Sequence, residues 1–204
     1  MLWGTGAHGV WVVVAGIGVG VAGLLTACGG GGNSAATAGV PTVTALSAQA
    51  ALGDKIFADT SLSASGRQSC ASCHSADNAH APANDLPVQP GGLLMDQQGR
   101  RNSPSLNYLS FSPAFAVAAD GTPSGGFFLD GRANSLIDQA GQPLLGAVEM
   151  ANVDKAEVVA RLSRAPYAAE FKQVFGADIL SRPDDAFDRI TLALQQYQDR
   201  KSVV

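Results

Sequence analysis

Cysteine, histidine and basic side chains are all scarce in this sequence. Its 204 residues include 3 Cys and 3 His, and 13 Lys and Arg stand against 17 Asp and Glu. An odd number of cysteines argues against a disulfide framework. The formal net charge is −4, and the sequence has no cluster of basic residues. This composition argues against a nucleic-acid-binding protein.

Charged side chains are absent from the start of the chain, where the first is Asp54. The uncharged apolar run at 10–25 is short and glycine-rich for a membrane span, but it suits the hydrophobic region of a secretory signal. Leu-Thr-Ala-Cys then ends at Cys28 and resembles the bacterial lipobox, in which the cysteine is lipidated. We expect a signal peptide over 1–27 and a flexible Gly/Ser/Ala linker over 28–45.

The basic residues that usually begin a signal peptide are missing, and only His8 and the amino terminus stand in their place. The start could therefore be misassigned, the segment could stay as an uncleaved anchor, or Cys28 could be a thiol in a signal cleaved elsewhere. The lipobox interpretation places the protein in the periplasm with a membrane lipid anchor. Gly29 after the cysteine favours the outer membrane.

Residues 46–204 show helical periodicity, without alternating strand runs or an internal repeat. Proline and glycine are dense over 81–105, and glycine over 120–132, which predicts long ordered loops that line a cofactor pocket. We therefore expect one all-α domain. Helices are predicted over 46–58, 133–140, 153–163 and 166–175, and from about Pro183 onward with Phe187, Ile190, Leu194 and Tyr197 at helical spacing.

A Cys-Ala-Ser-Cys-His motif spans 70–74. The thiols of Cys70 and Cys73 can each form a thioether to one porphyrin vinyl group, and His74 can then ligate the iron. The same spacing occurs in zinc half-sites and in thioredoxin-like redox pairs. Zinc would need two more ligands where only His80 is left, and a redox pair would need a βαβ context. The motif therefore predicts one covalent haem c.

Four sequence blocks, in order, resemble the N-terminal haem domain of bacterial di-haem cytochrome c peroxidases and their maturation-enzyme relatives. They are LGDKIFADTSLSASGRQSCASCH (52–74), GRRNSPSLNY (99–108), LDGRANSLIDQA (129–140) and VEM (148–150). The resemblance implies a cytochrome c-like haem domain whose haem meets hydrogen peroxide, with His74 as the proximal ligand.

The resemblance also implies roles for three other residues. Glu149 matches an acidic proton shuttle over the distal face, Gln139 matches a glutamine beside it, and Asn102 matches a residue of a calcium site between domains. A carboxylate can pass a proton between the two peroxide oxygens as their bond breaks. The apolar neighbours of Glu149 should raise its pKa, although the residue alone would be interpreted as a capping or surface carboxylate.

Some positions depart from the family pattern. The stretch 88–92 lacks the His that ligates the resting iron in many members, so we expect an open distal side or a substitute ligand such as His80. Leu129 stands where the family has a Trp that relays electrons, and Phe127 and Phe128 are predicted to pack in the core instead.

Asp130 is predicted to pair with Arg132, and Arg101 to act similarly, near the haem. A second Cys-x-x-Cys-His is absent from the sequence. We therefore expect either a truncated product or a single-haem relative, with the C-terminal haem domain missing.

The leading prediction is a peroxidase that reduces hydrogen peroxide with electrons from a small cytochrome or cupredoxin. One alternative is a single-haem electron carrier, whose second iron ligand would be Met95 or Met150. Another is a haem-binding remnant with little turnover. Further candidate partners are the membrane, through the lipid anchor, and a second copy of the chain in a homodimer.

Overall fold

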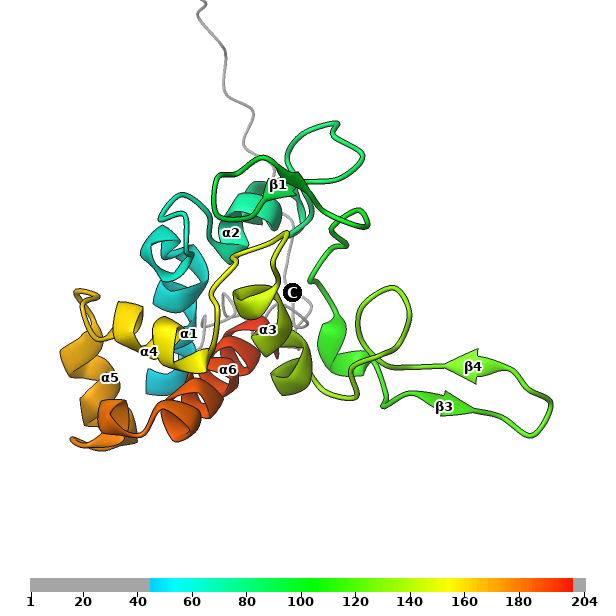
Figure 1. Ribbon diagram of the computed structural model, residues 1–204. Coiled ribbons are helices and arrows are strands. Elements are labelled where there is room, and N and C mark those ends of the chain that lie inside the picture. The colour runs from blue at the N-terminus through cyan, green and yellow to red at the C-terminus, as the bar shows by residue number, and fades with distance from the viewer. Residues whose placement is uncertain (1–44, 200–204) are drawn as a thin grey trace, which may run out of the picture. The chain divides into compact units, whose positions relative to one another are not determined.

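The structure, a computed structural model, describes residues 45–199, which are mainly helical with a few short strands (Figure 1). The predicted signal peptide, Cys28 and the linker, apart from Ala45, lie outside these residues. The helices are α1 (Ala48–Ala58), α2 (Cys70–Cys73), α3 (Leu136–Leu145), α4 (Lys155–Leu162), α5 (Ala168–Phe175) and α6 (Pro183–Asp199). The strands are β1 (Pro90–Gly91) paired antiparallel with β2 (Gln97–Gln98), and β3 (Ala116–Val117) paired antiparallel with β4 (Pro123–Ser124).

The predicted helices are present, with boundaries shifted by a few residues. α3 begins later than expected because Ser135 caps it, its side-chain oxygen accepting the Asp138 N–H at 3.1 Å. Asp154 caps α4 in the predicted way, accepting the Glu157 N–H at 2.8 Å. The strand pairs are additional features, since two-residue strands leave no alternation to detect. Within residues 45–199, no helix has the length and apolar character needed to cross a membrane.

Helices α1 and α6 lie side by side, although they are the first and last helices of the described residues (Figure 1). Gly53 permits the close approach: a Cβ at this position would lie 2.0 Å from the backbone carbonyl oxygen of Ala193. Leu52 and Ile56 of α1 and Ile190 of α6 are buried in the main core. Side chains from α3, α4 and α5 complete that core.

Gly53→Ala is expected to lower the free energy of unfolding, because its methyl group would force α1 away from the α6 backbone. Overpacking costs about 1–3 kcal/mol, and a rigid carbonyl at this distance should outweigh the roughly 1 kcal/mol gained in helix propensity. Gly141→Ala in α3 is the matched control, since its Cβ would meet the movable ring of Phe187 at 3.1 Å. Denaturant midpoints would compare the two; equal midpoints would contradict the packing argument.

The segment between α2 and α3 carries both strand pairs and a second, smaller core. Phe127, Ala133 and Leu136 are buried there. Phe128 packs against this core, and the Arg132 guanidinium lies 3.5 Å from the centre of its ring. The packing predicted for Phe127 and Phe128 is therefore confirmed.

Candidate functional site

Helix α2 is a single turn that places Cys70 and Cys73, three residues apart, on the same helical face. Ser72 holds the start of the turn, its hydroxyl oxygen accepting the Ser69 N–H at 3.0 Å. The His74 N–H then donates to the Cys70 carbonyl at 2.9 Å, which keeps the imidazole beside the two sulfurs. Both cysteines are free thiols.

The two thiols lie in a poorly solvated environment. Burial raises the pKa of Cys70 to about 12, with a smaller contribution from the neighbouring Cys73. Burial also raises the pKa of Cys73, while a hydrogen bond from Gln68 opposes that shift. The charge of Glu149 adds to the rise at both thiols, so its carboxylate lies within electrostatic range of the motif.

The His74 ring is oriented by a backbone carbonyl. His74 Nδ1 lies 3.0 Å from the carbonyl oxygen of His80, and because a carbonyl can only accept, Nδ1 carries the proton. The lone pair is then on Nε2, the nitrogen available to a metal. Burial lowers the pKa of His74, and hydrogen bonding to the backbone carbonyls of His80 and Pro104 partly opposes this shift. The lowered pKa favours the neutral ring, which is the form that ligates iron.

His80 lies behind His74. Its carbonyl faces Nδ1 of His74, on the side of that ring opposite to Nε2. Its own imidazole contacts the edge of Phe57, with 6.1 Å between ring centres, and its Nδ1 lies 3.0 Å from Asn107 Oδ1. This position does not favour His80 as a distal ligand, which would have to approach the iron opposite to His74.

Glu149 lies in the turn that follows α3. Its carboxylate bends over Gly146, where a Cβ would lie 2.3 Å from Glu149 Oε2. Burial raises the pKa of Glu149, as expected from its apolar neighbours, and the charge of Arg132 partly opposes the rise. A desolvated carboxylate with a raised pKa accepts a proton more readily than an ordinary glutamate does.

A series of contacts joins this turn to the cysteine motif. Buried Gln68 donates from Nε2 to Cys73 Sγ at 3.6 Å and to the Pro90 carbonyl at 3.2 Å. The adjoining Gly92 N–H donates to the Glu149 carbonyl at 2.8 Å. Gln68 and the backbone of β1 therefore link the Cys73 thiol to the backbone of Glu149. Gln68 was not predicted, because nothing in its local sequence marks it.

The other predicted residues are less closely connected. Gln139 is half-buried on α3, and within residues 45–199 no hydrogen bond joins its side chain to Glu149. Asn102 is exposed beside a groove that Asn84 and Asp85 also line. Among the described residues, no group of three or more His, Cys, Asp or Glu side chains is placed to hold a metal ion.

Met95 and Met150 are the two methionines that could supply a second iron ligand in an electron carrier. Met150 is buried in the main core, which is not a position open to a cofactor. Met95 lies in the turn between β1 and β2, and its sulfur accepts the Ser65 hydroxyl at 3.5 Å.

The predicted ion pair near the site is present. Arg132 lies 2.8 Å from Asp130, and Arg101 lies 3.4 Å from the other oxygen of the same carboxylate. Arg132 also donates from Nε to Gln142 of α3 at 3.2 Å. Leu129, which directly precedes Asp130, is 58% exposed.

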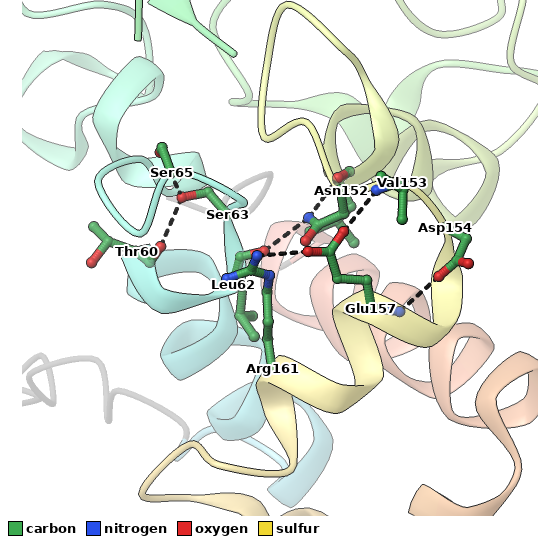
Figure 2. A network of polar contacts seen from close by, with 10 residues as sticks. Thr60, Leu62, Ser63, Ser65, Asn152, Val153, Asp154, Glu157 and Arg161 are labelled. Atoms are coloured by element: carbon green, nitrogen blue, oxygen red, sulfur yellow. Dashed lines mark hydrogen bonds and ion pairs between the residues drawn. The ribbon is translucent and has the colours of Figure 1, made fainter. Parts of the chain in front are cut away.

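Asn152 holds in place the turn that carries Glu149. The sequence analysis did not predict this role. It is buried, and its Nδ2 donates to the Leu62 carbonyl at 2.9 Å and to the Leu144 carbonyl at 2.8 Å (Figure 2). Beside it, Glu157 accepts from the Val153 N–H at 2.8 Å. These bonds fix the turn to α3 and to the segment that precedes the cysteine motif.

Comparison with known proteins agrees with this arrangement. Residues 47–203 match the family described as di-haem cytochrome c peroxidase. The methylamine utilization protein MauG of Paracoccus denitrificans is 44% identical over 158 residues, covering 74% of this chain and 40% of that protein. Cytochrome c551 peroxidase of Nitrosomonas europaea is 33% identical, covering 74% of this chain and 39% of that protein.

A solved structure gives the same result in three dimensions. The crystal structure of the diheme peroxidase BthA from Burkholderia thailandensis superposes with a TM-score of 0.69 at 33% identity, covering 76% of this chain and 39% of that one. The chain therefore spans about 40% of the length of the relatives that it matches.

Proposed function

Since the chain belongs to the di-haem cytochrome c peroxidase family, we propose that residues 46–204 form a cytochrome c-like domain that carries one haem c and reduces hydrogen peroxide. The observation that carries the proposal is the placement of a half-buried Glu149, whose pKa is raised by desolvation, within electrostatic range of the Cys70 and Cys73 thiols. When bound, the haem supplies the redox-active iron at which peroxide takes up electrons.

The cofactor would be held by three residues of one short segment. Cys70 and Cys73 would form the thioethers, and His74 Nε2 would ligate the iron from the same side. The contacts fit this assignment, because both thiols are free and the His80 carbonyl holds the proton on Nδ1. The family relationship implies haem c, and the sequence contains one attachment motif.

Glu149 would move protons in this reaction. Reduction of hydrogen peroxide to two waters consumes two electrons and two protons, and the oxygen that leaves must be protonated. The carboxylate can accept the proton from one peroxide oxygen and deliver it to the other. Its burial supports the role, since desolvation raises the pKa of Glu149 and reduces its cost of carrying a proton. Gln139 is proposed to orient the peroxide beside it.

We extend the proposal to features that rest on sequence patterns and on the family resemblance. They are electron supply from a small cytochrome or cupredoxin, a periplasmic lipid anchor at Cys28, and calcium at Asn102. Because the chain spans about 40% of the length of its relatives, the activity of the whole protein is proposed as well.

A second candidate is a haem oxidoreductase role in methylamine utilization. It is favoured by the higher identity to the MauG protein, 44%, than to the cytochrome c551 peroxidase, 33%. Deleting the gene would separate the two: the peroxidase proposal expects loss of peroxide clearance, and the second candidate expects loss of growth on methylamine.

The optical spectrum of the ferric, haem-loaded protein tests the leading proposal. We expect a high-spin spectrum that changes quickly when peroxide is added, because the stretch 88–92 contains no His to ligate the iron opposite to His74. A low-spin His/Met spectrum that does not respond to peroxide would instead identify an electron carrier. Met95→Leu would show whether that residue supplies the second ligand.

A further inference from the structure

The carbonyl that orients His74 lies in a strained part of the backbone. Ala79 and His80 have φ angles of 51° and 55°, so two consecutive residues other than glycine adopt the left-handed conformation. Such residues are strained and persist only where their surroundings hold them in place. The strain turns the His80 carbonyl toward Nδ1 of His74, 3.0 Å away.

Three consecutive residues at the end of the long loop, 105–107, hold this backbone in place. The Ser105 hydroxyl donates to the Ala79 carbonyl at 2.5 Å, and the Leu106 N–H donates to the His80 carbonyl at 3.3 Å. The His80 ring donates from Nδ1 to Asn107 Oδ1 at 3.0 Å, because an amide oxygen can only accept. Residues 105–107 thus bind the backbone carbonyls of Ala79 and His80 and also the side chain of His80.

We propose that Asn107 and Ser105 are positioning residues that set the reduction potential of the haem through His80. Their contacts fix how closely the His80 carbonyl approaches His74 Nδ1. A stronger hydrogen bond at Nδ1 makes the imidazole a more basic ligand, which favours ferric over ferrous iron. Loosening the strained pair weakens that bond and raises the potential. The inference rests on the proposed haem ligation by His74, and it concerns the proximal side only.

A purely structural role for Asn107 would predict a different result. Its loss would then destabilise the fold and leave the electronic properties of bound haem unchanged. Asn84 offers a matched control, since it pairs with Gln89 through two reciprocal side-chain hydrogen bonds of 3.0 Å in the neighbouring loop. Asn84→Ala therefore removes bonds of the same type without touching residues 79 and 80.

The test measures the reduction potential and the iron–histidine stretching frequency of the haem-loaded full chain. Asn107→Ala is expected to raise the potential and lower the frequency. Ser105→Ala should shift both in the same direction by less, and it carries the test if Asn107→Ala fails to fold. Asn107→Asp keeps the acceptor oxygen and should not raise the potential. Asn84→Ala should leave both values at those of the unmodified protein.

Each outcome is decisive. Unchanged values in the Asn107 and Ser105 variants, or an equal shift in Asn84→Ala, would overturn the positioning role and leave the peroxidase proposal intact. Haem that binds with shifted potentials but does not react with peroxide would overturn the catalytic proposal alone. A chain that attaches no haem would overturn both.

Discussion

Glu149→Gln is expected to slow the reaction of the haem-loaded protein with peroxide by about 10²–10⁴-fold, the usual contribution of a positioned acid–base group. The amide has the shape of the carboxyl group but cannot accept the peroxide proton. Stopped-flow absorbance at several peroxide concentrations would give the second-order rate constant. Glu170→Gln is the control, because that carboxylate pairs with Lys55 on the surface, away from the cysteine motif.

The pH dependence of the same rate gives a second check. Glu149 must be deprotonated to accept a proton, so the rate should fall as the pH decreases through its pKa. Because burial raises the pKa of Glu149, this loss should occur at higher pH than for an ordinary glutamate. The acid limb should disappear in Glu149→Gln. A variant that keeps both the rate and the limb would show that another group moves the proton.

Asn152→Leu is expected to have the largest effect on stability. It leaves the buried Leu62 and Leu144 carbonyls without their side-chain donor. The Leu144 carbonyl keeps the backbone N–H of residue 152, which donates to it at 3.3 Å, so only the Leu62 carbonyl is left unsatisfied. An unsatisfied buried polar group costs about 1–3 kcal/mol, and the free energy of unfolding should fall by about that amount. Chemical denaturation would measure the loss. Leucine has the same branching and the same number of side-chain heavy atoms as asparagine, so it removes the hydrogen bonds without leaving a cavity.

The control for this prediction is an asparagine on the surface. Asn102→Leu changes the same groups at an exposed position and should alter the stability by no more than about 0.5 kcal/mol. We also expect Asn152→Leu to slow the peroxide reaction, since Asn152 holds the Leu144 carbonyl near the end of α3, where the turn that carries Glu149 begins. Equal stabilities of the two variants would contradict the anchoring role.

The parts of this structure that could be predicted from sequence are those with a local signal. Helical spacing at Phe187, Ile190 and Leu194 correctly placed the buried face of α6. The positions of Cys70 and His74 follow from their spacing alone. Glu149 was different: its neighbours predicted a raised pKa, but only the family resemblance distinguished it from a surface carboxylate.

The residues that the sequence did not reveal act through contacts far apart in the chain. Asn152 donates to Leu62, 90 residues earlier, and no local pattern marks either position. The His80 carbonyl is a backbone group, so its role depends on a left-handed conformation that an Ala-His pair does not suggest. Sequence patterns predict elements, whereas these contacts depend on how the elements meet.

The pairing of α1 with α6 also bears on the order in which the protein is assembled. Because the chain is synthesised from its N-terminus, Cys70 and Cys73 emerge long before α6 is available to pack against Gly53. Once the core has closed, desolvation raises the pKa of Cys70 to about 12, and the half-buried thiol then reacts poorly. Attachment of the cofactor is therefore expected on the unclosed chain, with α6 sealing the domain after the bonds have formed.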